Sequence, residues 1–341
     1  MIKKELGSSI SYDYILQNPC IREWKETITD QICTYELRDY YPLIENQLGI
    51  YIAWEKNRQC LQYNVPSAFK IVGTNTGRLI DSIEKAIANH PILKAKITIL
   101  DGKAYMQRRD DLKITIINEY LREDPSVSFF QKRIRPFNLL EDNLVRFEVY
   151  HTDRNVYMFM DIHHIIYDGE SANILLSEIN KICMNQPIMP EPITAFDYAL
   201  YYDDWRKSGN YAEHENYFDS LIKNTKSFNY PAIKSGGLLP GSLGTYSGKV
   251  SKEKIHRICR ILGITENVFF ATIITQVFHR ISMDECIQIA TISNGRAMTQ
   301  LSETIGMLVC TLPFISKTTT GSVASIMHGN QKQLIETIKH E

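Results

Sequence analysis

The sequence has no excess of charge of either sign and no long apolar run. Its 341 residues include 38 Lys and Arg against 39 Asp and Glu, which leaves a net charge of -1. Because a near-neutral chain has no general attraction to nucleic acid or to an anionic membrane, we expect neither as a partner. No stretch of 18 apolar residues is present, and no apolar segment follows the lysines at the N-terminus. The sequence therefore predicts neither a membrane-spanning helix nor a signal peptide.

Cysteine is sparse and scattered. The seven cysteines form no C-x-x-C pair, and their number is odd. This pattern argues against a disulfide framework and against a zinc ribbon. A reducing cytoplasm is the simplest location for such a chain. No serine or cysteine stands in a nucleophile-elbow motif, so the sequence indicates no catalytic nucleophile of its own.

The remaining composition is that of a folded protein. Hydrophobic residues make up 44% of the chain, and the length is enough for two domains with a large core. Apolar periodicity predicts both helices and strands. The predicted strands lie at 67–73, in a hairpin at 92–109 with Asp101-Gly102 at its turn, in a second hairpin at 143–164, and at 286–293 and 306–316. The predicted helices are 76–91, 171–183 (with Ser171 as N-cap), 251–263 (with Gly263 as C-cap) and 265–282.

The order of these elements predicts the fold class. Strands and helices alternate in both halves, while residues 184–250 are rich in turns. We therefore expect an α/β (α+β) protein of two similar lobes, divided near residue 180.

Two adjacent histidines, His163 and His164, stand at the end of a predicted strand. Neighbouring side chains on a strand point to opposite faces, so the pair is a poor metal site and we expect no metal or directly bound cofactor. One interpretation is a hydrogen-bonded structural histidine beside a turn. The other is a histidine that projects into a cleft, where neutral imidazole can take and return a proton near pH 7. Without a nucleophile of its own, the chain would serve one that the substrate brings.

The stretch His163–Gly169 resembles the H-H-x-x-x-D-G motif of the chloramphenicol-acetyltransferase-like superfamily. Its neighbours are similar to the condensation domains of nonribosomal peptide synthetases. Lys94 and Cys310 depart from the usual Arg and Asn of that family. The similar segments, in the family's order, are YPLIENQLGIYIAWE (41–55), NHPILKAKI (89–97), AFDYALYYDDW (195–205) and SNGRAMTQLSETIGMLVCTLPF (293–314).

The resemblance implies an amide-bond-forming acyltransferase. A donor thioester on an upstream peptidyl-carrier domain would meet the amine of an acceptor on a downstream carrier, both on 4'-phosphopantetheine arms. His164 is the implied catalytic residue, as general base or as the group that positions the amine. His163, Asp168, Gly169 and Arg296 have supporting roles, with Asp168 and Arg296 as an ion pair. An adjacent adenylation domain would be a further partner of this monomeric module fragment, in the biosynthesis of an antibiotic or another secondary metabolite.

The resemblance also implies an organisation. Residues 1–40 resemble the end of a peptidyl-carrier domain plus a linker. Residues 41–180 would form the N-terminal lobe and 181–341 a truncated C-terminal lobe, since the chain stops inside a further motif of the family. Two such lobes would form a V with a central tunnel, the second being incomplete. Two alternatives stay open: an epimerisation-type domain of the same superfamily, and a non-catalytic fragment that docks carriers.

Overall fold

The computed structural model describes residues 32, 34–209, 211–223, 225, 245–317 and 321–341. By their contacts these residues divide into two units. Unit 1 runs to Ser208 and takes in the later segment Asn294–Val309, and unit 2 comprises Gly209–Ser293 and Cys310–Glu341. The predicted carrier-like segment, 1–40, lies largely outside the described residues. The α/β class is confirmed, because each unit combines a sheet with helices.

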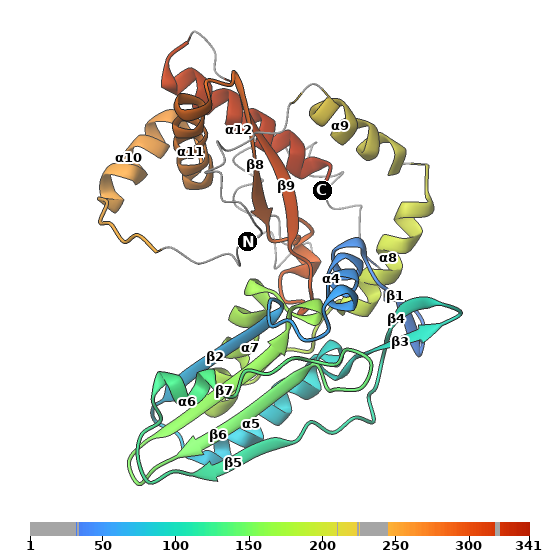
Figure 1. Ribbon diagram of the computed structural model, residues 1–341. Helices are drawn as coiled ribbons and strands as arrows, with labels where there is room; N and C mark the ends of the chain where they lie inside the picture. Colours follow the sequence, from blue (N-terminus) through green and yellow to red (C-terminus); the bar gives the residue numbers. More distant parts are fainter. Residues whose placement is uncertain (1–31, 33, 210, 224, 226–244, 318–320) are drawn as a thin grey trace, which may run out of the picture. The chain divides into compact units, whose positions relative to one another are not determined.

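The larger sheet of unit 1 has the order β2-β7-β6-β5 (Figure 1). Its central strands β6 and β7 form the predicted second hairpin, with Val145 opposite Ile162. Both strands are buried along almost their whole length, which explains their rows of Val, Ile, Phe and Met. The strands are β2 (Asn64–Ile71), β5 (Ile116–Tyr120), β6 (Val145–His151) and β7 (Val156–His163).

A smaller sheet of unit 1 has the order β1-β4-β3. The predicted Asp101-Gly102 turn joins its two longer strands, with φ angles of 48° and 74°. Two successive positive φ angles match the right-handed twist of a hairpin, and Asp-Gly is a favoured pair for them. The strands are β1 (Tyr40–Pro42), β3 (Lys96–Leu100) and β4 (Lys103–Gln107).

Helices α5 and α7 pack against each other in unit 1. On α5 the buried residues Leu79, Ile83, Ala86 and Ile87 recur at helical spacing and form one apolar face. The helices are α4 (Glu45–Lys56), α5 (Thr76–Asn89), α6 (Val127–Gln131), α7 (Gly169–Cys183) and α8 (Ala195–Lys207), with 3₁₀ turns η1 (Pro91–Lys94), η2 (His164–Ile166) and η3 (Thr299–Leu301).

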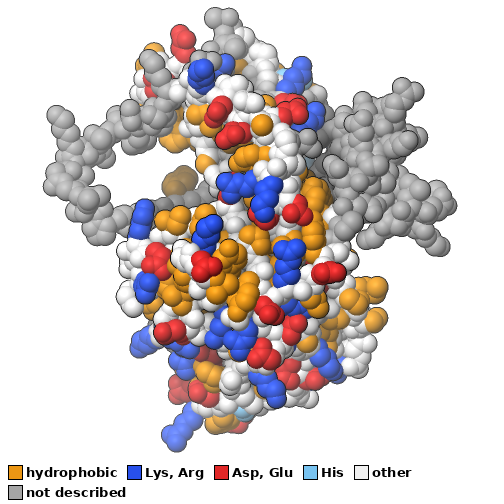
Figure 2. Space-filling view, turned by 90° about the vertical axis from the view of Figure 1, so that its right-hand side faces the viewer, with side chains coloured by type: hydrophobic (Ala, Val, Ile, Leu, Met, Phe, Trp, Pro, Cys, Tyr) orange, Lys and Arg blue, Asp and Glu red, His pale blue; other side chains and the backbone are white. Residues whose placement is uncertain are grey.

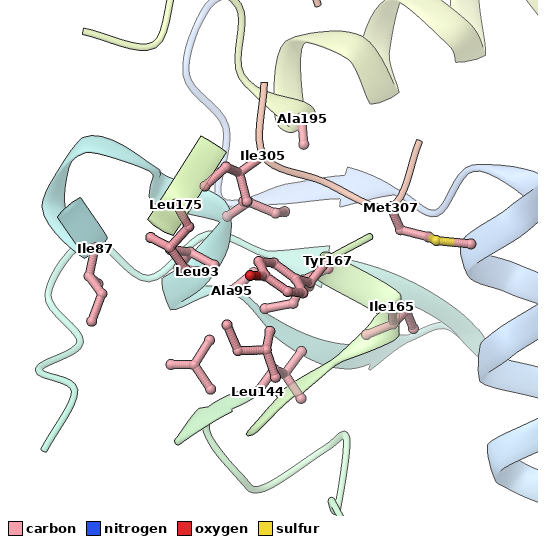
Figure 3. Close-up of a cluster of buried hydrophobic side chains, with 14 of the residues drawn as sticks. Ile87, Leu93, Ala95, Leu144, Ile165, Tyr167, Leu175, Ala195, Ile305 and Met307 are labelled. Carbon is pink, nitrogen blue, oxygen red and sulfur yellow. The ribbon is translucent and has the colours of Figure 1, made fainter. Parts of the chain in front are cut away.

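The core of unit 1 includes side chains from its returning segment. Ile305 and Met307 belong to the same buried cluster as Leu93, Leu175 and Tyr167. Figure 3 shows the Tyr167 ring within this cluster and Ile305 beside Leu175. This packing helps to explain why the contacts of unit 1 do not end at residue 180, the predicted lobe boundary.

The described residues of unit 2 form one antiparallel pair of strands and a smaller core. The core residues include Val268, Phe314, Met327 and Leu334. Gly263 ends α10 with a φ of 61°, as predicted for a C-cap. The elements are α9 (Tyr211–Lys223), α10 (Lys252–Leu262), α11 (Glu266–Ser282), β8 (Cys286–Ser293), β9 (Cys310–Lys317) and α12 (Val323–Lys339).

Some predicted elements differ from the structure. Residues 184–250 hold two helices, α8 and α9, where the sequence predicted turns. The start of α8 carries a signal that could have revealed it, because Thr194 and Asp197 form a reciprocal capping box. The strand predicted at 306–316 begins only at Cys310. The residues before it are used instead to contact Asp168.

Among the described residues, no single helix is both long and apolar enough to cross a membrane. Helices α10 and α11 meet the length and composition requirement only as a pair, and they are bent by 96°. On the face shown in Figure 2, basic and acidic side chains lie intermixed with apolar ones.

Candidate active site

Strand β7 ends at His163, and the chain turns into η2 at His164. The Nδ1 atom of His163 accepts a hydrogen bond from the backbone of Ile165 at 3.2 Å, which caps this turn. The ring is buried and meets the ring of Phe137 edge-on at 5.5 Å. Burial, followed by the nearby His164 and Arg146, lowers the pKa of His163 to about 3. His163 is therefore a neutral ring that holds the turn.

His164 has a different environment, although it is the next residue. Its side chain is only partly buried. The Nδ1 atom is buried and has no hydrogen-bond partner among the described residues, so no described carboxylate binds this nitrogen. The prediction placed the two rings on opposite faces of one strand. The strand ends between them, so the change from strand to 3₁₀ turn, and not strand alternation, separates their environments.

Asp168 is the N-cap of α7, and its carboxylate is saturated with hydrogen bonds. The predicted N-cap, Ser171, is wrong: its backbone N–H donates to Asp168 Oδ1 at 2.8 Å, so the cap lies three residues earlier. The Ser171 hydroxyl also donates to Oδ1, at 2.7 Å. Leu308 and Val309 donate their backbone N–H groups to Oδ2 at 3.0 and 3.2 Å. The predicted ion pair is confirmed, with Arg296 Nη1 at 2.9 Å from Oδ2 and Nη2 at 3.0 Å from Oδ1.

The loop Asn294–Val309 presents Arg296 to this carboxylate. Arg296 is only 8% exposed and also donates to the carbonyls of Asn294 and Thr304, at 2.8 and 2.9 Å. Gly295 precedes it with a φ of 65°, and a Cβ there would lie 1.8 Å from the carbonyl oxygen of Leu308. The glycine is therefore required for the two ends of the loop to meet.

Gly169, the first residue of α7, is exposed. A Cβ added there would meet no atom within 4 Å, and the backbone is not left-handed. The fold therefore does not demand glycine at this position. The space above it is open, one residue from Asp168 and five from His164.

A comparison with protein families assigns the chain. The model of the condensation domain matches residues 37–341. This chain belongs to the condensation-domain family. The match begins close to the first described residues, and it covers the motif His163–Gly169 together with Arg296.

Curated relatives of this condensation domain are long synthetases. It is 24% identical over 331 residues to gramicidin S synthase 2 of Brevibacillus brevis, covering 93% of the chain and 7% of that protein. It is 25% identical over 326 residues to bacitracin synthase 3 of Bacillus licheniformis, covering 91% of the chain and 5% of that protein. The chain thus spans less than a tenth of the length of either protein.

Solved structures share its fold. The first condensation domain of the calcium-dependent antibiotic synthetase, in complex with substrate analogue 3a, gives a TM-score of 0.70 at 15% identity over 88% of this chain and 75% of that one. The starter condensation domain of rhizomide synthetase gives a TM-score of 0.75 at 14% identity, and the match covers 89% of this chain and 72% of that one. The X-domain from teicoplanin biosynthesis, solved in complex with OxyB, gives a TM-score of 0.76 at 14% identity, and the match covers 91% of this chain and 72% of that one.

The condensation domain also contains a buried charged cluster that the sequence did not reveal. His90 lies between the carboxylates of Glu178 and Glu191, with side chains 1%, 9% and 1% exposed. These residues are far apart in the sequence, so no local pattern connects them. Only His90 stood inside a segment with family resemblance.

No group of three or more His, Cys, Asp or Glu side chains is placed to hold a metal ion in the part of the chain that the structure describes. The Nδ1 atom of His163 accepts the backbone N–H of Ile165, so this nitrogen is not available to a metal ion.

Proposed function

We propose that this condensation domain forms an amide bond between two carrier-bound substrates, with His164 as the residue that handles the proton. The donor is an acyl group held as a thioester, and the acceptor is the amine of an aminoacyl thioester. The observation that carries the proposal is the contrast within the motif. His163 and Asp168 are committed to the fold, whereas the side chain of His164 is only partly buried and its Nδ1 atom has no hydrogen-bond partner among the described residues.

The bonds and protons of the reaction balance without any reactant besides the thioester and the amine. The acceptor amine attacks the donor carbonyl, which forms the C–N bond and moves an electron pair onto the carbonyl oxygen. Collapse of this intermediate breaks the C–S bond. A proton leaves the nitrogen and is returned to the departing sulfur, so the products are an amide and a thiol. Imidazole can carry this proton in both directions near neutral pH.

Asp168 and Arg296 support the site by structure. The carboxylate of Asp168 accepts from Ser171, Arg296, Leu308 and Val309, so it has no free position for a substrate proton. Its role is to join the start of α7 to the loop Asn294–Val309. The open space at Gly169 fits the passage of a thin pantetheine arm.

Partners follow from this reaction. Two peptidyl-carrier domains would deliver the substrates on 4'-phosphopantetheine, and an adenylation domain would load the acceptor carrier. Curated relatives named as synthases of gramicidin S and bacitracin support a role in peptide-antibiotic assembly. The V-shaped pair of lobes, the cytoplasmic location and the monomeric state stay predictions.

The test is transfer of a labelled donor from one loaded carrier to an acceptor on a second carrier. We expect His164→Ala to reduce the rate by about 10²- to 10⁴-fold, the usual contribution of a positioned acid–base group. His163→Asn is the matched control. It removes the neighbouring imidazole but keeps an acceptor for Ile165, so it should affect stability more than chemistry.

Unchanged transfer by His164→Ala would contradict the assignment of His164. Exchange of the donor α-hydrogen with heavy water, without transfer, would instead favour the epimerisation reaction. Carrier binding with neither reaction would indicate a docking domain.

A further inference from the structure

We infer that His90, Glu178 and Glu191 form a positioning cluster that fixes the loop Asn294–Val309, and through it the Asp168 end of the catalytic motif. The inference rests on the proposed function only for its activity readout. His90, Glu178 and Glu191 touch no reacting atom in this account. They act through the backbone of the loop.

The cluster is built from three segments of unit 1. His90 is fully buried at the C-terminal end of α5. Its Nε2 atom lies 3.0 Å from Glu178 Oε2 on α7, and its Nδ1 atom lies 3.1 Å from Glu191 Oε1, in the segment before α8. Asn89 Nδ2 donates to both oxygens of Glu178, at 3.1 and 3.3 Å. The imidazole therefore connects two carboxylates that come from different segments.

Glu191 links this cluster to the loop. The Oε1 atom that faces His90 also accepts the backbone N–H of Ile305 at 2.8 Å. The side chain of Thr304 donates to the carbonyl of Ile193 at 2.7 Å, beside the same segment. Ile305 then inserts its side chain into the core near Leu175 (Figure 3).

The same stretch of loop also bonds to Asp168 and to the partners of Asp168. The carbonyl of Thr304 accepts from Arg296, and the N–H of Gly306 donates to the Ser171 hydroxyl at 3.0 Å. The Ser171 hydroxyl in turn donates to Asp168, which also receives Leu308. Consecutive loop residues therefore contact the His90 cluster and the Asp168 network, and a shift at Ile305 must move both.

The contact between Glu191 and the loop depends on the charge of His90. Burial opposes a charge on His90, but its hydrogen bond to Glu178 and its ion-pair contact with Glu191 prevail and raise the pKa of His90 to about 9. Those two carboxylates are the charged groups that act on it. A neutral His90 would leave two buried acids near each other with no cation between them. One of them would then have to take up a proton or move. Burial raises the pKa of Glu191, so Glu191 is the carboxylate expected to take up the proton, and this weakens the acceptor for Ile305.

A cluster of this kind is more than a stabilising contact. Apolar residues of similar volume often stabilise a core as well as a buried ion pair does, so charge is a costly way to obtain stability alone. What the carboxylate of Glu191 adds is a fixed position for one backbone N–H. We therefore expect the cluster to affect the geometry of the site beyond its effect on unfolding.

The experiment compares His90→Gln, Glu191→Gln and the double variant with wild type. Ser82→Ala is the control, because Ser82 is fully buried on α5 and contacts Cys183 on α7, but no bond of Ser82 reaches the loop. Measurements are kcat and KM of peptide transfer, the melting temperature, and the hydrogen-exchange rates of the amides of Ile305, Leu308 and Val309.

We expect His90→Gln to lower kcat by about 10- to 100-fold with little change in KM, because misplaced groups cost rate. Exchange at the three loop amides should accelerate, while exchange in the hairpin β3–β4 should not. The double variant should recover part of both losses, since two neutral amides can bond to each other.

In wild type, the hydrogen-exchange rates of the loop amides should rise beyond their ordinary pH dependence as the pH passes about 9. This titration needs no variant to fold.

The outcomes separate the two proposals. A loss of melting temperature in His90→Gln like that of Ser82→Ala, with unchanged kcat and unchanged relative exchange at the loop, would overturn the inference. If wild type shows no peptide transfer but the loop amides respond to His90→Gln and to pH as expected, the proposed function fails and the positioning role stands. If transfer occurs but the loop amides do not respond, only the positioning role fails.

Discussion

Each oxygen of the Asp168 carboxylate accepts three hydrogen bonds. Those to Oδ1 come from Arg296 and from the N–H and hydroxyl of Ser171, and those to Oδ2 come from Arg296, Leu308 and Val309. Asp168 is 1% exposed and its guanidinium partner is 8% exposed. Each charge in this buried site is stabilised by the other, because water cannot take the place of either partner.

Asp168→Asn should therefore lower the free energy of unfolding by about 3–5 kcal/mol, the cost of an uncompensated buried charge. The amide would present N–H groups where one oxygen now accepts, and Arg296 would keep its charge. Chemical denaturation of the two proteins gives the difference. A second variant, Asp168→Asn with Arg296→Met, should recover part of the loss. A loss below 1 kcal/mol in the single variant would contradict the pairing as a source of stability.

His163 gives a pH dependence of known sign. Its pKa in the folded protein is about 3, well below the ordinary value of 6.5. Between these values the unfolded chain binds a proton that the folded chain does not, so stability falls as the pH falls.

From pH 7 to pH 4 this single group should remove about 3 kcal/mol of unfolding free energy. His163→Asn cannot titrate, so the advantage of wild type over this variant should shrink by that amount over the same range. Denaturant melts of both proteins at several pH values supply the comparison. A constant difference between them would mean that His163 already binds its proton in the folded state.

At the scale of elements, the end of the loop Asn294–Val309 differs from the prediction, because residues 306–309 form part of a loop and not of a strand. The sequence predicted a strand from residue 306, but the N–H groups of Leu308 and Val309 go to Asp168. Gly295 makes the close return possible, because its backbone is left-handed and the carbonyl of Leu308 occupies the place of a side chain.

Gly295→Ala should therefore destabilise unit 1 by about 3 kcal/mol, from a left-handed backbone together with a steric clash. Gly102→Ala is the matched control. Its φ of 74° is also left-handed, but no atom lies within 4 Å of the added Cβ. It should cost only the backbone part, about 1–2 kcal/mol. Equal losses in the two variants, measured by thermal melting, would show that the close approach to Leu308 is not rigid.

At the scale of the whole molecule, the main hydrophobic cores of the two units differ in size among the described residues. Unit 1 has a far larger set of buried apolar residues than unit 2. In unit 2, α11 carries a row of apolar residues that are 41–50% exposed, namely Phe270, Ile273, Ile274, Val277 and Ile281. Separate cores of different size do not have to unfold in one step.

We expect two transitions in denaturant. Trp54 and Trp205 belong to unit 1, and the third tryptophan, Trp24, lies outside the described residues. In a Trp24→Phe background, tryptophan fluorescence should therefore follow unit 1, while far-ultraviolet circular dichroism should follow both units. Phe314→Ala, in the core of unit 2, should cost about 3–5 kcal/mol and shift only the circular-dichroism transition of that unit. Asp168→Asn should shift the fluorescence transition instead. A single transition that both variants move equally would contradict independent unfolding.

The sequence by itself determined the local structure and the identity of the motif. The hairpins at β3–β4 and β6–β7, helices α5, α10 and α11, and the C-cap at Gly263 follow from periodicity and turn chemistry, which act between near neighbours in the chain. The resemblance of His163–Gly169 to a known motif gave the family that the comparison then confirmed. It also gave Arg296 as the partner of Asp168, since family motifs preserve contacts that periodicity cannot reveal.

Only the tertiary structure decided how the histidines differ and what holds the loop. His163 loses its proton because the fold buries it beside Phe137, and His164 keeps a nitrogen without a described partner because the strand ends one residue earlier. Helix α8 was missed because its apolar residues are weakly periodic, although Thr194 and Asp197 marked its start. The cluster of His90, Glu178 and Glu191 joins residues about 90 to 100 positions apart, and only the folded chain brings such groups within 3.1 Å.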